Sequence, residues 1–209
     1  WFFVNGKAAG LVDTYAGAWK YDVTDCVTPG KVASVVAVVD NVVGSRNTQC
    51  DSANKWGGLV RDVELEATPQ TCIDDAWVRG DFDARTAEAH VRVDGGTGFA
   101  GRAVRVTVDG RSAETAVTAA NAEDVRVTLP LAAFRPWSPA DPHLYVARIE
   151  LLEDGRPVQT RVERFGVRNL EVVGREFRLN GSPFYFRGYG DDSSYPITGV
   201  SPAAREAHL

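Results

Sequence analysis

Apolar and polar residues alternate in short runs along most of the chain, with Gly, Asn, Asp and Pro between the runs. A period of two is typical of strands that bury one face, because successive side chains of a strand point to opposite sides. The period near 3.6 that indicates amphipathic helices is almost absent. Clear alternating runs are residues 89–93, 103–108, 124–129 and 144–152. The sequence therefore predicts an all-β protein made of β-sandwiches.

Turn signals separate these runs. Asp94-Gly95-Gly96, Asp109-Gly110 and Asp154-Gly155 each stand between two alternating stretches. Asn180-Gly181 tolerates the positive φ of a tight turn, so we expect a hairpin with arms at residues 176–179 and 183–187.

Later in the chain, Ser201 and Pro202 are suited to the N-cap and first position of a short helix over residues 201–206. The pattern changes near residues 67–70 and again near residues 165–168. These changes predict three parts, at residues 1–69, 70–168 and 169–209.

Composition and charge limit the classes of partner that we expect. Apolar residues make up 44% and charged residues 24% of the chain, as in an ordinary globular protein. The formal charge is −5, and the 23 basic residues are scattered, so nucleic acids and acidic membranes are not expected as partners. No stretch has the roughly 20 consecutive apolar residues of a transmembrane helix.

The sequence predicts neither a metal site nor a cofactor. The three histidines stand far apart, and we find no phosphate-binding glycine loop, Ser-His-Asp elbow or redox cysteine pair. Cys26, Cys50 and Cys72 leave two interpretations open: a bridge between the first two, or buried thiols that act as small apolar side chains.

Four segments stand out, in this order along the chain. They are residues 4–7 with 15–25 (VNGK, YAGAWKYDVTD), residues 56–65 (WGGLVRDVEL), residues 136–145 (PWSPADPHLY), and residues 165–168 with 177–188 (FGVR, FRLNGSPFYFRG). Together they resemble the family 2 glycoside hydrolases, which include β-galactosidases, β-glucuronidases and β-mannosidases. At residues 31–36 the chain departs from the family's pattern, which leaves the register of that strand open.

The resemblance implies a fold for each part. Residues 1–69 would be a partial sugar-binding jelly roll, residues 70–168 an immunoglobulin-like β-sandwich, and residues 169–209 a hairpin with the first strand of a truncated (β/α)8 barrel. The chain begins within a strand at Trp1 and contains no methionine, so we expect it to be a piece of a longer polypeptide. A half sandwich leaves strand edges unpaired, which also permits self-association.

The same resemblance implies the chemistry of the parent protein. Retaining β-glycosidases use two carboxyl groups about 5–5.5 Å apart. In family 2 these are glutamates on later barrel strands, at the C-terminal face of the barrel. Neither position falls within this chain, so we assign no catalytic residue and expect the chain alone to be inactive. The partner implied for the parent enzyme is a β-glycoside.

Residues that contact substrate are a separate question. Asp191 and Asp192 follow the expected first barrel strand, which would put them at the catalytic mouth, with Asp192 the better match to the family. The alternative is a solvated loop with turn chemistry.

Asp51 and Trp56 lie in a loop that reaches toward the active site in some relatives. There Asp51 would supply an acid, and the Trp56 ring would stack on a sugar face. The alternative is a surface loop whose tryptophan packs between domains. We expect Trp137 and Tyr145, which lie among three prolines, to be core residues rather than a sugar platform.

Two functions from other classes remain open. The sandwiches are equally compatible with a stand-alone carbohydrate-binding or adhesion module, or with a structural spacer, because a fold alone does not fix a function. The segment at residues 187–192 favours the enzyme, since a binding module has no need of the start of a barrel.

Overall fold

The computed structural model describes residues 1–12, 19–40, 58–59, 62–96, 98–131 and 134–188. Within these residues the regular structure is thirteen β-strands and one short 3-10 helix, so the prediction of an all-β protein is confirmed. The chain divides into two compact units, one of Trp1–Leu65 with Gly188–Leu209 and one of Glu66–Arg187. No helix among the described residues is long and apolar enough to cross a membrane.

The first unit contains one small antiparallel sheet in the order β2-β1-β3. Its elements are β1 (Phe2–Val4), β2 (Lys7–Gly10), the 3-10 helix η1 (Thr24–Cys26) and β3 (Val35–Ala37). Asn5 turns the chain with a φ of 49°, and its side chain donates to the Cys26 carbonyl at 2.8 Å and accepts from the Ser34 amide at 2.9 Å. This asparagine therefore ties η1 and the start of β3 to the β1–β2 hairpin.

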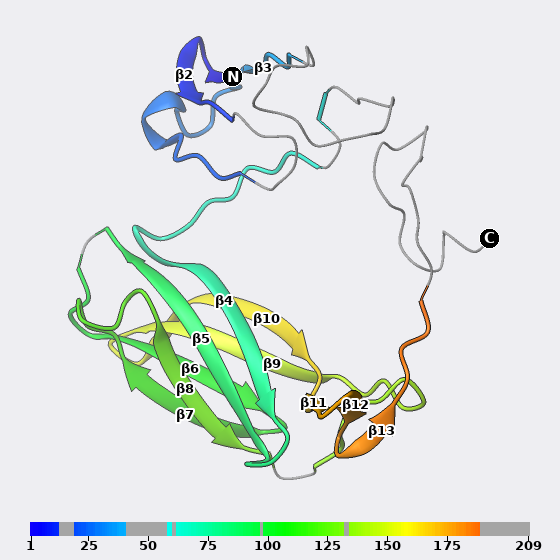
Figure 1. The fold of residues 1–209 in the computed structure, drawn as a ribbon. Helices are drawn as coiled ribbons and strands as arrows, with labels where there is room; N and C mark the ends of the chain where they lie inside the picture. The colour runs from blue at the N-terminus through cyan, green and yellow to red at the C-terminus, as the bar shows by residue number, and fades with distance from the viewer. Residues whose placement is uncertain (13–18, 41–57, 60–61, 97, 132–133, 189–209) are drawn as a thin grey trace. The chain divides into compact units, whose positions relative to one another are not determined.

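The second unit is a sandwich of two antiparallel sheets (Figure 1). One sheet has the order β4-β5-β8, with β4 (Thr71–Asp81), β5 (Thr86–Gly95) and β8 (Val125–Pro130). The other has the order β10-β9-β6-β7, with β6 (Arg102–Val108), β7 (Arg111–Ala116), β9 (Tyr145–Glu153) and β10 (Arg156–Phe165).

The core lies between these sheets and follows from the alternation of the sequence. In β8, Val125, Val127 and Leu129 are buried while the residues between them are exposed. The fully buried aliphatic side chains of the other strands include Ile73, Val91, Val104, Val106, Ile149 and Leu151. Burial of each such side chain stabilises the fold by about 1.5–3 kcal/mol. Tyr145 is also buried, as predicted, whereas Trp137 is half-buried.

Two of the predicted turns are confirmed. Asp109-Gly110 and Asp154-Gly155 adopt positive φ at both positions and join β6 to β7 and β9 to β10. The predicted turn at residues 94–96 is displaced, because Gly95 still pairs with Thr71 of β4 and extends β5. The chain turns just afterwards, where the Gly98 amide donates to the Gly95 carbonyl at 2.8 Å.

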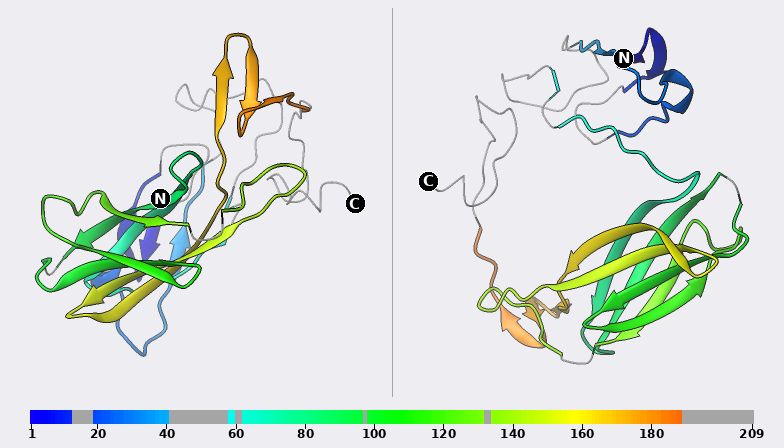
Figure 2. Two further views of the ribbon diagram at one scale, coloured as in Figure 1. Left: turned by 90° about the horizontal axis from the view of Figure 1, so that it is seen from below. Right: turned by 180° about the vertical axis from the view of Figure 1, so that it is seen from behind.

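A third antiparallel sheet follows the end of β10, in the order β11-β12-β13 (Figure 2). Its strands are β11 (Leu170–Val173), β12 (Glu176–Leu179) and β13 (Ser182–Phe184). The Asn180-Gly181 turn is confirmed, with φ values of 53° and 78°.

The sequence missed β11, and its second hairpin arm at residues 183–187 was too long. Phe184 pairs with Phe177, one residue from the start of β12. Residues 185–187 therefore pass the end of their partner strand and have no ladder neighbour among the described residues.

Two other predictions fall partly or wholly outside the described residues. The short helix at residues 201–206 lies there, as does Cys50. Cys26 and Cys72 are half-buried free thiols.

Candidate functional site

The residues predicted to contact substrate, Asp51, Trp56, Asp191 and Asp192, all lie outside the described residues. They stay predictions. The described part of the second unit offers three polar arrangements, and each is built from side chains that strand register or loop paths bring together.

The first arrangement joins the sandwich to the third sheet around Trp137. The Trp137 amide donates to the Val167 carbonyl at 2.8 Å. A Cβ on Gly166 would lie 3.1 Å from the Trp137 Cβ and 3.2 Å from its ring, so the absence of a side chain there permits the close approach. The Arg168 guanidinium lies over the indole, 5.0 Å from the ring centroid. Residues 136–137 and 166–168, two of the family-like segments, thus pack directly on each other.

Asn180 belongs to the same family-like segment as residues 166–168 and adds the turn of the third sheet to this junction. Its side-chain Nδ2 donates to the Trp137 carbonyl at 3.0 Å, and its Oδ1 accepts from the Asn169 amide at 3.0 Å. Its backbone amide donates to the Asn169 carbonyl at 2.8 Å. One asparagine therefore fixes the β12–β13 turn to the chain that leaves the sandwich.

The loop that carries Trp137 is held by an ion pair with two hydrogen bonds. Arg135 Nε and Nη2 donate to the two carboxylate oxygens of Asp141 at 2.8 and 2.6 Å. The Arg135 hydrogen bond holds the pKa of Asp141 below its usual value, with the positive charge adding to the effect. The Arg135 amide also donates to the Tyr145 hydroxyl at 2.8 Å, so this buried ring anchors the loop.

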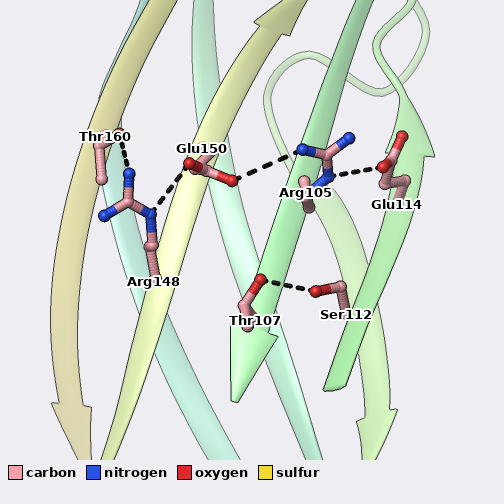
Figure 3. A network of polar contacts seen from close by, with 7 residues as sticks. All are labelled: Arg105, Thr107, Ser112, Glu114, Arg148, Glu150 and Thr160. Carbon is pink, nitrogen blue, oxygen red and sulfur yellow. Dashed lines mark hydrogen bonds and ion pairs between the residues drawn. The ribbon is translucent and has the colours of Figure 1, made fainter. Parts of the chain in front are cut away.

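The second arrangement is a chain of polar contacts across the outer face of the larger sheet (Figure 3). It runs through Thr160, Arg148, Glu150, Arg105 and Glu114, from β10 to β7. Glu150 lies at its centre, 2.9 Å from Arg148 Nε and 3.8 Å from Arg105 Nη1, with its side chain only 9% exposed. Arg105 and Thr160 are the cross-strand partners of Glu150. The charged groups of this network therefore bind one another, and we do not assign a ligand site to them.

The third arrangement is a hollow of about 320 Å³ on the outer face of β4, β5 and β8, which we call the Trp77 hollow. Its side-chain lining is Asp75, Trp77, His90, Arg92, Glu123, Asp124 and Arg126. The Trp77 and His90 rings stack with centroids 3.8 Å apart and planes 4° from parallel. They meet because the two residues are directly opposite in the β4–β5 ladder.

Two carboxylates contact the imidazole of this pair. His90 Nδ1 lies 2.8 Å from Asp124 Oδ1, and His90 Nε2 lies 2.8 Å from Glu88 Oε1. Arg126 Nε donates to the other Asp124 oxygen at 2.7 Å. The Arg126 hydrogen bond, and next the one from His90, lower the pKa of Asp124.

Arg92 borders the same hollow and is paired with Asp74, to which its Nε donates at 2.7 Å. That hydrogen bond and the charge of Asp74 raise the pKa of Arg92, with smaller contributions from Asp75 and Glu123.

The sequence did not identify the Trp77 hollow, because a pairing of Trp77 with His90 depends on the hairpin register. The signal that would have found it is their equal spacing from the Asp81–Thr86 pair that closes the β4–β5 turn. Within the residues that the structure describes, no group of three His, Cys, Asp or Glu side chains is placed to hold a metal ion.

Comparisons with known proteins agree with this fold. The sequence model of the family described as "Glycosyl hydrolases family 2" matches residues 71–168, which are the sandwich. The chain is 25% identical to a β-galactosidase of Streptococcus thermophilus over 193 residues, which cover 89% of this chain and 18% of that protein. It is 28% identical to a β-galactosidase of Arthrobacter sp. (strain B7), covering 89% of this chain and 17% of that protein.

A β-glucuronidase of Paenibacillus borealis is 27% identical, with 87% of this chain and 33% of that protein covered. Across these three relatives, the chain spans between 17% and 33% of the curated protein.

Solved structures share the fold. A glycosyl hydrolase family 2 member from Bacteroides cellulosilyticus DSM 14838 matches with a TM-score of 0.69 at 24% identity, covering 90% of this chain and 27% of that chain. The FMN-binding β-glucuronidase from Facaelibacterium prausnitzii L2-6 matches with a TM-score of 0.68 at 20% identity, covering 87% and 30%.

The sandwich carries the family match, and the Trp137 junction joins two of the four segments that resemble the family. The curated relatives align with most of the chain. Residues 71–168 of this chain are therefore similar to family 2 of the glycosyl hydrolases.

Proposed function

We propose that this chain is the non-catalytic N-terminal region of a retaining β-glycosidase, and that it supports and completes the active site of a (β/α)8 barrel. The curated relatives named above are β-galactosidases and a β-glucuronidase, and each extends well beyond the part aligned with this chain. A β-glycoside is accordingly the proposed substrate of the longer protein.

The observation that carries this proposal is the third sheet with the Trp137 junction. The junction holds the sheet through three hydrogen bonds, which Asn180 makes with Trp137 and Asn169. The sheet ends in aromatic side chains that are exposed: Phe177 at 45%, Phe186 at 50% and Tyr185 at 83%. Phe186 packs edge-on against Phe177 and Phe184, with centroids 4.8 and 5.0 Å apart. A contiguous exposed apolar surface of this kind is typical of a surface that another domain covers.

The occupant we assign to this surface is the catalytic barrel of the same polypeptide. β13 leads directly into residues 185–188, and the aligned region of each relative is a minor part of its length. In this arrangement residues 169–209 form the entry into the barrel, and Asp191 and Asp192 contact the sugar at its mouth. Asp51 and Trp56 approach the same substrate from residues 1–69, which we assign to a partial jelly roll.

Activity measurements on two polypeptides test this proposal. We expect the 209-residue chain to leave p-nitrophenyl β-D-galactoside and β-D-glucuronide intact, while a longer polypeptide from the same gene hydrolyses one of them. Turnover by the 209-residue chain would contradict the non-catalytic role. Sugar binding by the longer polypeptide without turnover would instead support a stand-alone binding module.

A variant of the longer polypeptide tests the supporting role. Asn180→Asp keeps the acceptor for Asn169 but removes the donor to the Trp137 carbonyl, a hydrogen bond of about 0.5–1.5 kcal/mol. We expect kcat/KM to fall about 2- to 10-fold if that contact positions the barrel. The matched control is Asp109→Asn in the β6–β7 turn, which tolerates either residue at its φ of 49°. An unchanged kcat/KM in Asn180→Asp would contradict the supporting role.

A further inference from the structure

We propose that the Trp77 hollow is a non-catalytic binding site for one ring of a neutral sugar. It lies on the outer face of the sandwich and is formed by β4, β5 and the start of β8. The proposal does not depend on the catalytic role proposed above, because every residue that it uses belongs to the sandwich itself.

The size of the hollow fits a single ring. Its volume of about 320 Å³ is at the lower end of the roughly 300–1,000 Å³ that small-molecule pockets occupy. A flat side chain and a few polar groups placed around such a volume match the mixed apolar and hydroxylated surface of a pyranose.

Trp77 supplies the flat side chain. Trp77 is 49% exposed although the His90 ring covers one face of its indole, and no other ring of the described residues stacks on it. β4 is the edge strand of its sheet, and the side chains of β10 that bond to it, Gln159 and Arg161, bond to Ile73 rather than to Trp77. The C–H groups of a sugar ring pack well on the face of an aromatic ring.

His90 orients this platform before any ligand arrives. Both imidazole nitrogens are engaged, by Asp124 and by Glu88, and the His90 side chain is only 12% exposed. A ring held between two carboxylates keeps the stacked indole in one orientation. Preorganisation of this kind lowers the entropy cost of binding.

Asp75 and Glu123 supply the acceptors. Both residues are exposed, and neither forms an ion pair with a basic side chain of the described residues. Asp75 Oδ1 accepts from the Ala76 amide at 3.0 Å, which orients the carboxylate and leaves Oδ2 for a ligand. Sugar hydroxyls are O–H donors, and hydrogen bonds to an ionised acceptor are stronger than those between neutral groups.

The charge balance selects a neutral ligand. The guanidinium groups of Arg92 and Arg126 are already paired with Asp74 and Asp124. The unpaired charges at the hollow are therefore negative, and a uronic acid would be repelled. We accordingly assign hexoses such as galactose or glucose to the site rather than glucuronate.

The test is a titration of the full 209-residue chain followed by ¹H–¹⁵N NMR. The probes are methyl β-D-galactopyranoside, methyl β-D-glucopyranoside and glucuronate, and the Trp77 indole signal is assigned from its loss in Trp77→Phe. We expect a saturable shift of that signal with a neutral glycoside and a Kd of about 1–50 mM, the range of a weak single-ring site. Glucuronate should bind at least about 10-fold more weakly.

Two variants and a control separate binding from folding. Trp77→Ala should abolish the saturable shift of neighbouring backbone amides. Glu123→Gln alters an exposed side chain outside the strands, so the fold persists, and it should weaken the neutral glycoside about 3- to 10-fold. Arg79→Ala, on β4 but outside the lining, should bind as the parent chain does.

Three results would overturn the proposal. The first is the absence of a saturable shift up to about 100 mM glycoside, a concentration far above the expected Kd. The second is binding of the glycoside by Glu123→Gln and by Trp77→Ala that equals binding by the unaltered chain. The third is a shift of the Trp77 signal with protein concentration alone, which would make this face a contact between copies of the chain.

Discussion

Asp141 shows how a single exposed side chain holds an irregular loop against the core. Residues 136–142 contain three prolines and make few ladder hydrogen bonds, so the loop depends on side chains to keep its path. Asp141 binds Arg135 through both carboxylate oxygens, and the Arg135 amide binds the hydroxyl of the buried Tyr145. The loop carries Trp137, so the ion pair acts on the junction as well.

The titration of Asp141 leads to a prediction about acid stability. Its pKa is lower in the folded chain than the value of about 3.9 expected in the unfolded chain, chiefly because of the Arg135 hydrogen bond. At pH values between the folded and the unfolded pKa of Asp141, the unfolded state therefore binds more protons than the folded state. The stabilisation is fully present above the unfolded pKa and is lost as the pH falls through the folded pKa.

We expect Asp141→Asn to lower the free energy of unfolding at pH 7 and to make its decline below about pH 4.5 shallower. Urea unfolding between pH 7 and pH 2 measures both effects. Asp109→Asn is the control, since Asp109 belongs to the β6–β7 turn and not to the Arg135–Asp141 ion pair, and this variant should show the same decline at low pH as the unaltered chain. Parallel pH curves for the parent and Asp141→Asn would contradict the assignment.

At the scale of elements, side chains close both open sides of the sandwich. On one side β10 lies beside β4: Gln159 Oε1 accepts from the Ile73 amide at 2.6 Å, and Arg161 Nη2 donates to the Ile73 carbonyl at 3.0 Å. Bulges occur at this place in both strands, between Ile73 and Asp75 and between Pro157 and Gln159. On the other side Thr115 of β7 donates to the Arg126 carbonyl of β8 at 2.8 Å. Edge strands are thereby kept from pairing with other chains.

This closure predicts a cost for losing Gln159. Gln159→Leu keeps the bulk of the side chain but leaves the Ile73 amide without its acceptor, beside a side chain that is 1% exposed. We expect the free energy of unfolding to fall by about 1–3 kcal/mol, the cost of an unsatisfied buried donor. Urea unfolding at neutral pH measures it.

The matched control is Val162→Thr on the same strand, where the side chain is 59% exposed. It should change the free energy of unfolding by no more than about 0.5 kcal/mol. A loss of that small size in Gln159→Leu would show that water replaces the glutamine and that the β4–β10 contact adds little.

At the scale of the whole chain, the two units differ in how much core they hold. Almost all of the buried apolar residues belong to Glu66–Arg187, whereas Val4 is the buried apolar residue among those described in the first unit. The small sheet of that unit leaves Val35 and Val36 of β3 about half exposed. Local stability follows buried apolar contact, so the first unit should open far more easily than the sandwich.

Limited trypsin digestion of the full chain tests this difference. We expect cleavage at Lys20 or Lys31 at least about 10-fold faster than at Arg105 or Arg148, because proteolysis follows the population of locally opened states. Mass spectrometry of early time points identifies the sites, and a resistant product spanning the sandwich should accumulate. Early cleavage within β6 or β9 would contradict the assignment of the stable core.

The sequence by itself determined the all-β character, several of the strands and three of the tight turns. Alternation fixed the buried positions of β8, and Asp-Gly or Asn-Gly pairs fixed three tight turns, because both signals depend only on neighbours along the chain. The four family-like segments, in their order along the chain, also established the family resemblance. The substrate contacts predicted at Asp51, Trp56, Asp191 and Asp192 stay predictions.

Only the tertiary structure decided which distant side chains meet. Trp77 stacks on His90, Glu150 lies between two arginines, and Asn180 reaches the Trp137 carbonyl because strand register and loop paths bring them together. The short β11 and the early end of β13 were likewise set by the length of the neighbouring β12. Pairing between strands is a long-range property, and a local pattern of polar and apolar residues does not contain it.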